Sequence, residues 1–202
     1  MRRLVLATGN PGKLAEFRTA LETQGIEVLG LDALSDREEI AETGSTFEEN
    51  ARLKAEGYSR RTELPVIADD SGLVVDALHG EPGIHSARYG GSEYDDPGRC
   101  RLVLEKLRGV PQARRTARFL CVLALARAGR TLAVFNGSVE GRIIEELRGG
   151  GGFGYDPIFF HEGAGCSFAE LSREEKQKLS HRGQAIARFL EAIRKGTVSW
   201  QG

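Results

Sequence analysis

The segment Pro65-Val66-Ile67-Ala68-Asp69-Asp70-Ser71-Gly72 decides how the rest of this chain is interpreted. Its apolar start favours a buried strand at residues 65–69, and Gly72 supplies backbone freedom where that strand stops. Residues 73–75 either continue this strand or begin a short neighbouring one. Ligands of open α/β sheets bind at the carboxyl ends of the strands. Two adjacent carboxylates there can hold a divalent cation or activate a water molecule. A turn capped by Asp, Ser and Gly has the same composition, so the segment alone leaves both interpretations open.

The composition indicates one α/β domain and gives no sign of a nucleic-acid or membrane partner. The 202 residues are enough to bury a substantial core, and the formal net charge is only −1. The longest apolar run, residues 119–126, is far shorter than a membrane span, and residues 4–7 are too few for a signal peptide. The 3 cysteines have no CxxC spacing, which fits a reducing compartment and argues against a zinc site. We therefore expect a soluble cytoplasmic protein.

The chain begins with the pattern of a βαβ unit. Residues 3–8 predict a buried strand, residues 13–25 an amphipathic helix, and residues 26–29 a second strand. The first strand is joined to the helix by Thr8-Gly9-Asn10-Pro11-Gly12-Lys13, where backbone amides and the helix dipole favour phosphate. This is not a Walker A loop, because two residues separate its glycines and Leu14 follows the lysine. The alternative is an ordinary strand-to-helix turn with a solvated lysine.

The remaining elements predict a mixed architecture. Thr46 and Glu49 form a capping box, in which Thr46 caps the amide of Glu49 while Glu49 reaches back. Residues 116–126 and 131–144 predict an antiparallel hairpin, a different pattern from the βαβ start. We also expect helices over residues 46–61 and 96–107, a short strand at 158–160, a helix from Ser172, an interruption at residues 180–183, and an amphipathic C-terminal helix that includes residues 185–193.

Further candidates for chemistry lie in loops and near the helix interruption. Glu42 serves no apolar pattern and can face a site, although an exposed loop acid is the ordinary alternative. Phe153, between glycines, can stack on a flat ligand or pack in the core. Lys176, His181 and Arg182 can meet phosphate or a base carbonyl, or form a solvated basic face. Together these signals suggest metal-assisted phosphoryl chemistry on a nucleotide polyphosphate.

Seven motifs share an order and spacing with one protein family. They are Thr8–Lys13, Glu42-Thr43-Gly44, Thr46-Phe47-Glu48-Glu49-Asn50-Ala51, Ala68–Gly72, Gly83–Tyr89, Gly152-Phe153-Gly154-Tyr155-Asp156-Pro157 and Ser180-His181-Arg182-Gly183. On these motifs the chain resembles the inosine triphosphate pyrophosphatases, of the bacterial XTP/dITP diphosphatase type. The resemblance covers residues 2 to about 195, with no departure at a motif position, and leaves residues 196–202 as a C-terminal tail that we expect to be frayed.

The resemblance implies both an architecture and an activity. The implied fold is a single elongated α/β domain, residues 1–195, with a mixed, twisted central sheet flanked by helices and two lobes around a nucleotide cleft. The implied reaction is the Mg²⁺-dependent hydrolysis of dITP, ITP and XTP to the monophosphate and pyrophosphate. A cytoplasmic homodimer with this activity would keep deaminated purines out of DNA and RNA.

The same resemblance implies a role for individual positions. Asp70 is implied as the proton acceptor and as a metal ligand, with Glu42 as the second metal ligand. Asp69 points to the opposite face of a regular strand, so we expect it to be a supporting ligand or a structural residue. The implied substrate-binding residues are Thr8, Gly9, Asn10, Pro11, Gly12, Lys13, Ser71, Phe153, Gly154, Tyr155, Asp156, Lys176, His181 and Arg182.

Two other functions would keep part of this pattern. A pyrophosphatase for pyrimidine or modified nucleotides would retain Lys13 and Asp70 but need a base-reading set other than His181 and Arg182. A non-catalytic nucleotide sensor would be expected to lose carboxylates such as Glu42 or Asp70, and both are present.

Overall fold

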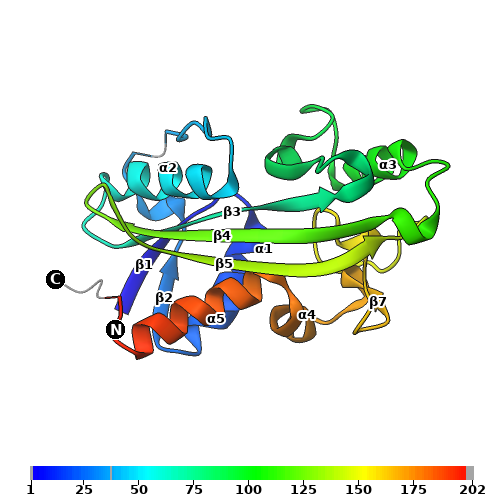
Figure 1. Ribbon diagram of the computed structural model, residues 1–202. Coiled ribbons are helices and arrows are strands. Elements are labelled where there is room, and N and C mark those ends of the chain that lie inside the picture. The colour runs from blue at the N-terminus through cyan, green and yellow to red at the C-terminus, as the bar shows by residue number, and fades with distance from the viewer. Residues whose placement is uncertain (1, 37, 199–202) are drawn as a thin grey trace. The chain divides into compact units, whose positions relative to one another are not determined.

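The structure is a computed structural model that describes residues 2–36 and 38–198 (Figure 1). Its strands are β1 (Arg2–Ala7), β2 (Ile26–Leu29), β3 (Val66–Val75), β4 (Thr116–Arg127), β5 (Arg130–Ile143), β6 (Phe159–His161) and β7 (Cys166–Ser167). Its helices are α1 (Pro11–Glu22), α2 (Phe47–Ser59), α3 (Asp96–Lys106), α4 (Arg173–Leu179) and α5 (His181–Arg194). Within the described ranges, no helix is both long and apolar enough to cross a membrane.

The strands form one mixed sheet, as predicted. Their hydrogen-bonded order is β2-β1-β3-β4-β5-β6-β7. Strand β1 pairs in parallel with both β2 and β3, whereas β6 pairs antiparallel with β5 and β7. The predicted βαβ start and the predicted hairpin are therefore both present. The hairpin turn consists of Ala128 and Gly129, whose φ angles of 50° and 77° match the left-handed conformation that tight hairpin turns need.

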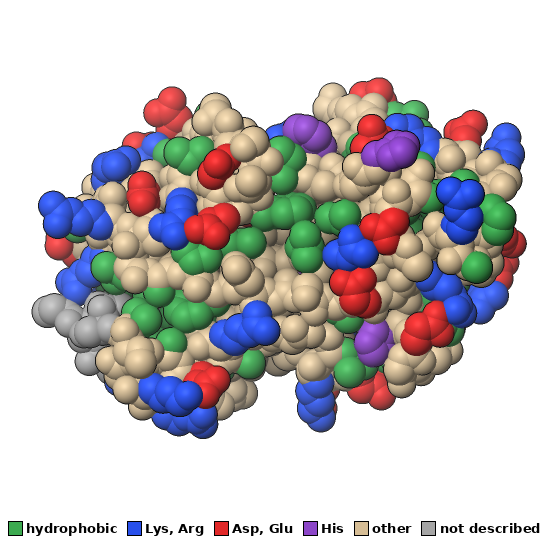
Figure 2. All heavy atoms as spheres, in the orientation of Figure 1, with side chains coloured by type: hydrophobic (Ala, Val, Ile, Leu, Met, Phe, Trp, Pro, Cys, Tyr) green, Lys and Arg blue, Asp and Glu red, His purple; other side chains and the backbone are tan. Residues whose placement is uncertain are grey.

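The chain divides into two compact units, and each is described by itself. Unit 1 comprises the described parts of residues 1–70, 121–137 and 182–202, and unit 2 comprises residues 71–120 and 138–181. Strands β3, β4 and β5 each contribute residues to both units. On the face drawn in Figure 2, basic and acidic side chains are interspersed rather than gathered into one basic patch.

Unit 1 has helices on both faces of its part of the sheet. Alternate residues of β1 point to opposite faces, as the period of a strand requires. On one face, Leu6 belongs to a buried cluster with Phe17 of α1 and Phe189 of α5. On the other face, Val5 belongs to a second cluster with Ala55 of α2 (Figure 1). The residues between β1 and α1 thereby follow the buried part of the strand, residues 4–7.

Unit 2 has its own core, which is rich in aromatic residues. The ring of Phe119 in β4 stacks on that of Phe168, with centroids 6.0 Å apart, and packs at a tilt of 49° against Phe159, with centroids 4.6 Å apart. Val103 of α3 and Tyr155 belong to the same buried cluster. This packing holds the segment around residue 155 against the sheet.

In the deciding segment β3 does not stop at residue 69, and of the two alternatives for residues 73–75 the structure shows continuation of the strand. It continues through the two carboxylates and Gly72 to Val75, so the turn interpretation is wrong. The glycine is needed for close packing rather than for a turn. A Cβ at Gly72 would lie 2.3 Å from Ser86 Oγ and 2.5 Å from Gly83 O. The strand whose carboxyl end lies beside the two carboxylates is β1, because its last residue, Ala7, pairs with Ala68 of β3.

The C-terminal part also differs in detail from the prediction. The interruption between α4 and α5 is confined to Ser180, because α5 begins at His181 and includes Gly183. In the predicted tail, Gly196 and Thr197 donate backbone hydrogen bonds to Ile193 and Ala192. The rest of that tail, residues 199–202, lies outside the described residues.

Candidate active site

The loop between β1 and α1 is organised as a helix N-terminus. Asn10 caps α1, because its Oδ1 accepts a hydrogen bond from the backbone N–H of Lys13 at 3.0 Å. Thr8 Oγ1 in turn accepts from the N–H of Asn10 at 3.1 Å. Pro11 occupies the start of the helix, where it costs no hydrogen bond. The positive end of the α1 dipole therefore lies at a rigid turn that suits an anion.

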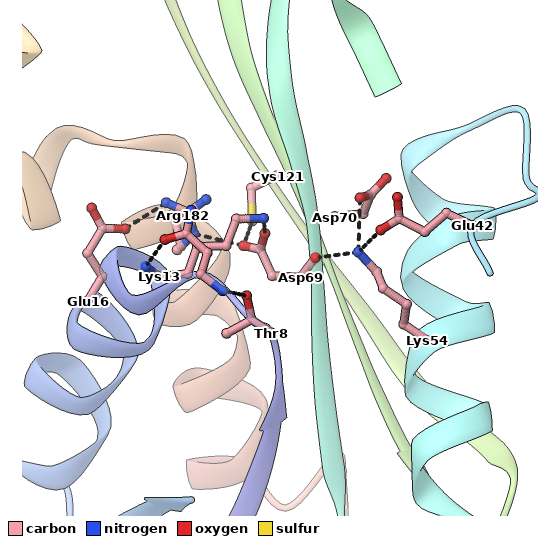
Figure 3. Close-up of polar contacts among 10 residues, drawn as sticks. Thr8, Lys13, Glu16, Glu42, Lys54, Asp69, Asp70, Cys121 and Arg182 are labelled. Carbon is pink, nitrogen blue, oxygen red and sulfur yellow. Dashed lines mark hydrogen bonds and ion pairs between the residues drawn. The ribbon is translucent and has the colours of Figure 1, made fainter. Parts of the chain in front are cut away.

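Lys13 is not the solvated lysine of an ordinary turn. Its side chain is only 17% exposed and forms an ion pair with Asp69 of β3. The other carboxylate oxygen of Asp69 accepts from Arg182 Nε at 2.7 Å and from the thiol of Cys121 at 3.2 Å (Figure 3). Three separate segments thus place donors around one buried carboxylate.

The charges around Asp69 keep it ionised. Burial alone would raise its pKa, but the positive charges of Arg182 and Lys13 outweigh burial and hold the pKa well below its usual range. Burial likewise works against the charge on Arg182, and the carboxylates of Asp69 and Glu16 outweigh it and raise the pKa of the guanidinium. Both oxygens of Asp69 are engaged by cationic donors, which favours a structural role over metal ligation.

Asp70 faces the other side of β3, as the alternation of a strand predicts (Figure 3). Its Oδ1 accepts a hydrogen bond from Lys54 Nζ at 3.1 Å, and the same ammonium donates to Glu42 Oε1 at 2.6 Å and to the carbonyl of Asp69 at 2.9 Å. The two carboxylates predicted as metal ligands are therefore brought together around one cation. Burial raises the pKa of Asp70, with Lys54 acting in the opposite direction.

Lys54 is a site residue that the sequence analysis did not single out. Sequence reasoning assigned it only to a face of the helix over residues 46–61. One signal was present: Lys54 lies three residues after Ala51 and next to Ala55, both fully buried. A lysine beside such an apolar stripe needs a buried partner, and the structure supplies two carboxylates. Their charges outweigh the effect of burial and raise the pKa of Lys54.

The loop that carries Glu42 is tied to the start of α2. The N–H of Gly44 donates to Asn50 Oδ1 at 2.8 Å, and a Cβ at Gly44 would meet that oxygen. Thr46 caps Glu49 as predicted, whereas the carboxylate of Glu49 accepts from the N–H and hydroxyl of Ser45. The short segment from Gly44 to Thr46 thereby sets the position of Glu42.

The donor set around Asp70 fits a magnesium ion. Asp70 Oδ2 is buried and accepts no hydrogen bond from the described residues. No group of three or more His, Cys, Asp or Glu suited to a metal occurs among residues 2–36 and 38–198. Mg²⁺ commonly binds one or two carboxylates and completes its shell with phosphate oxygens and water. Glu42 and Asp70 match that demand and do not match an all-protein cage.

Unit 2 brings together three other predicted residues. Asp156 Oδ2 accepts from the backbone N–H of Phe153 at 2.8 Å and from Lys176 Nζ at 2.5 Å. The ammonium of Lys176 also lies 4.4 Å from the centroid of the Phe153 ring. Gly152 and Gly154 flank this ring with φ angles of 70° and 61°, which favour glycine. Lys176 is 5% exposed, so the alternative of a solvated basic face fails for it.

Tyr155 and His181 have buried side chains in unit 2. The Tyr155 hydroxyl donates to the carbonyl of Ser86 at 2.8 Å, and burial raises its pKa. His181 is 4% exposed and stacks on Phe119, with ring centroids 4.8 Å apart and an interplanar angle of 12°. Ser71 follows Asp70 directly in β3 and is half-buried.

The N-terminus of α1 carries Lys13 and follows β1, and the neighbouring strand β3 carries the adjacent carboxylates Asp69 and Asp70. This arrangement is typical of an α/β protein that binds phosphate. Residues 4–192 match the model of the Ham1 family, and the chain belongs to that family. The family predicted from the motifs is thereby confirmed.

Relatives and solved structures agree with this assignment. The chain is 51% identical over 191 residues to the dITP/XTP pyrophosphatase of Geobacillus kaustophilus, covering 95% of this chain and 94% of that protein. It is 47% identical over 193 residues to the dITP/XTP pyrophosphatase of Bacillus subtilis, covering 96% and 98%. The structure of a HAM1 protein from Coxiella burnetii matches with a TM-score of 0.87 at 40% identity, over 96% of this chain and all of that one. The Staphylococcus aureus Ham1 protein matches with a TM-score of 0.84 at 41% identity, over 97% and 100%.

Proposed function

We propose that this chain is a Mg²⁺-dependent pyrophosphatase that hydrolyses dITP, ITP and XTP to the monophosphate and pyrophosphate. The observation that carries the proposal is the pair of carboxylates, Glu42 and Asp70, around Lys54, together with Lys13 at the N-terminus of α1. Two relatives that are 51% and 47% identical over nearly the whole chain are dITP/XTP pyrophosphatases, and their names support the substrate class.

The residues of unit 1 would bind the triphosphate and activate water. Lys13 and the backbone amides at the start of α1 would hold the phosphates, because the positive charge of the lysine and the positive end of the helix dipole both attract an anion. A magnesium ion held by Glu42 and Asp70 would neutralise charge on the phosphate oxygens during cleavage. Asp70 Oδ2, which accepts no hydrogen bond from the described residues, would orient the attacking water and accept its proton.

Lys54 would prepare Asp70 for this role. Two carboxylates close together repel each other, and one ammonium that donates to both offsets that repulsion. The same hydrogen bond fixes Oδ1 of Asp70 and so sets the direction of Oδ2. Lys54 therefore belongs to the proposed catalytic set, although the motifs did not mark it.

Selectivity for the base would come from donors that match a keto oxygen. The oxygen at position 6 of hypoxanthine or xanthine can accept from Arg182 or His181, and the ring of Phe153 would stack on the base. The amino group of adenine would leave those donors unpaired, at about 1–3 kcal/mol for each buried donor. Two such donors would disfavour ATP strongly. Lys176 and Asp156, which hold the Phe153 segment, would complete this part of the site.

The proposed role in the cell follows from this chemistry. An enzyme that removes dITP, ITP and XTP would keep deaminated purines out of DNA and RNA. We propose a cytoplasmic homodimer with a nucleoside triphosphate as its ligand and no nucleic-acid partner. The formal net charge of −1 supports the expectation that the chain has no nucleic-acid partner.

A pyrophosphate-release assay over a panel of nucleoside triphosphates with Mg²⁺ tests the proposal. The panel contains ITP, dITP and XTP beside ATP, GTP, CTP and UTP. We expect release from the first three and much less from the others. Preference for a pyrimidine nucleotide would instead indicate a different pyrophosphatase on the same fold. Binding of ITP without release of pyrophosphate would indicate a nucleotide sensor.

A further inference from the structure

Gly154, the residue that follows Phe153, is held at both its backbone groups by helix α3 of the same unit. The carboxylate oxygen Oδ2 of Asp96 accepts a hydrogen bond from the N–H of Gly154 at 2.7 Å. The thiol of Cys100 donates to the carbonyl of Gly154 at 3.3 Å. Asp96 and Cys100 have the i, i+4 spacing that places two side chains on the same face of a helix. Neither residue belongs to the motifs shared with the family.

The start of α3 does not need Asp96 as its cap. The N-cap is Asp95, whose Oδ1 accepts from the N–H of Gly98 at 2.7 Å. An acid in the first turn also suits the helix dipole, but that effect does not require the carboxylate to point in one particular direction. In Asp96 one oxygen is directed at Gly154, and the other lies 3.5 Å from Arg99. The helix itself therefore aims this carboxylate at the glycine.

The two contacts with Gly154 differ in strength. Burial raises the pKa of Cys100 to about 12, so the thiol keeps the proton that it donates. A thiol is a weak hydrogen-bond donor, however, whereas a hydrogen bond to a charged carboxylate is among the stronger ones. Asp96 thus supplies the larger part of the hold on Gly154.

These contacts fix the peptide group on one side of Phe153, and Asp156 fixes the peptide group on the other side. Asp156 Oδ2 accepts from the N–H of Phe153 at 2.8 Å, and the ammonium of Lys176 lies 4.4 Å from the ring centroid. Gly154 has a φ angle of 61°, and a glycine can leave that conformation for many others. Loss of the bond from Asp96 would leave Gly154 with the weaker thiol contact to α3, and the ring would lose its fixed direction.

We propose that Asp96 is a positioning residue for base stacking, which acts through the backbone of Gly154 on the ring of Phe153. The inference rests on the proposed function, in which that ring stacks on the base. The expected effect is on binding of the base and not on the chemistry at the phosphates, which is assigned to Glu42 and Asp70. It should be similar for ITP and ATP, since every base has a face on which a ring can stack.

The test compares Asp96→Ala and Asp96→Asn with the wild-type chain. Calorimetry with Mg²⁺ measures the dissociation constants of IMP, which carries the base, and of inorganic tripolyphosphate, which has none. We expect Asp96→Ala to weaken IMP binding by roughly tenfold, within the range for loss of one stacking contact, and to leave tripolyphosphate binding unchanged. The KM for ITP should rise with little change in kcat. Asp96→Asn should stay close to wild type, because its carbonyl oxygen still accepts from Gly154.

The matched control is Glu105→Ala, which removes an exposed acid from the same helix and should change none of these constants. A purely structural role for Asp96 would weaken IMP and tripolyphosphate alike and lower the melting temperature, and that result would overturn the proposal. An unchanged dissociation constant for IMP in folded Asp96→Ala would also overturn it. Should the alanine variant not fold, Asp96→Ser, whose side chain is too short to reach Gly154, takes its place with the same expected results.

A second comparison tests whether the effect passes through the ring. In a Phe153→Ala background, Asp96→Ala should weaken IMP binding no further, and full additivity of the two substitutions would overturn the positioning role. If Phe153→Ala alone leaves IMP binding unchanged, the ring does not stack on the base and the inference falls. A wild-type chain that releases no pyrophosphate from ITP would refute the proposed function, while the binding constants would still decide this inference.

Discussion

Lys54 and Asp70, 16 residues apart in the chain, are joined by a hydrogen bond of 3.1 Å between Nζ and Oδ1. The same ammonium lies 2.6 Å from Glu42 Oε1. One lysine, whose side chain is 13% exposed, thus holds together the two carboxylates proposed to bind the metal. Because the Lys54 ammonium donates to Glu42 in the loop before α2, and to Asp70 and the backbone carbonyl of Asp69 in β3, we infer that the lysine sets the geometry of the pair.

We therefore expect Lys54→Gln to impair catalysis without unfolding the chain. The amide can still donate to one carboxylate, but it cannot neutralise two. Loss of one electrostatic group at such a site typically costs roughly 100-fold in kcat or more. Pyrophosphate release from ITP at saturating Mg²⁺ measures the effect.

The control for Lys54 lies on the same helix. Arg52 pairs with Glu48 one turn earlier, and both side chains are more than 40% exposed. Arg52→Gln should leave the rate near that of the wild-type chain. A Lys54→Gln enzyme that is as active as Arg52→Gln would contradict the proposed role.

Asp70→Asn should abolish turnover and leave folding intact. Asparagine has the same shape, and its carbonyl oxygen can still accept from Lys54. It cannot take a proton from water, and loss of a general base typically costs about 10²–10⁴-fold. Single-turnover pyrophosphate release measures the loss, and circular dichroism with a melting curve checks the fold. Near-normal turnover would rule out Asp70 as the proton acceptor.

Removal of the metal should stop the reaction reversibly. We expect EDTA to abolish pyrophosphate release and added Mg²⁺ to restore it. Glu42→Gln should raise the Mg²⁺ concentration needed for half-maximal rate, because one of two carboxylate ligands is lost. Even loss of an outer-shell partner weakens metal sites by about 10–100-fold, which sets the scale of the shift. Glu39→Gln, an exposed acid in the same loop, is the control. Equal Mg²⁺ dependence in both variants would remove Glu42 from the metal site.

Local patterns predicted the early elements well, because each depends on neighbours in the sequence. The buried strand at residues 3–8, the helix capped by Thr46 and the hairpin around Gly129 all follow from spacing, capping and turn residues. The opposite faces of Asp69 and Asp70 follow from the two-residue period of a strand.

Contacts between distant residues were not predictable in the same way. Sequence reasoning left open whether β3 continues past residue 69, because Gly72 resembles a turn residue. The glycine is instead required by the approach of Ser86, which no local pattern shows. Lys54 and Asp96 were missed for the same reason, since their partners lie on other segments that only the folded chain brings near.

Gly72→Ala tests this explanation of the glycine. Its Cβ would lie 2.3 Å from Ser86 Oγ, and that hydroxyl is itself fixed by bonds to Gly83 O and to the N–H of Leu73. Such overpacking typically lowers the free energy of unfolding by about 1–3 kcal/mol. Gly150→Ala is the control, because its Cβ would meet nothing within 4 Å. Urea unfolding measures both variants, and equal midpoints would show that the close approach at Gly72 is not required.

Thiol reactivity tests the packing of both units at once. Cys100 and Cys121 are almost fully buried, and burial raises the pKa of Cys100 to about 12 and that of Cys121 well above its usual value. Cys166 is partly exposed, and partial burial raises its pKa more modestly. The thiolate is the reactive form, so buried thiols with a raised pKa are protected twice. At pH 8, dithionitrobenzoate should react with one thiol of the native chain and with all three in denaturant. Cys166→Ser should remove the native reaction, and a native thiol that still reacts in this variant would contradict the burial of Cys100 or Cys121.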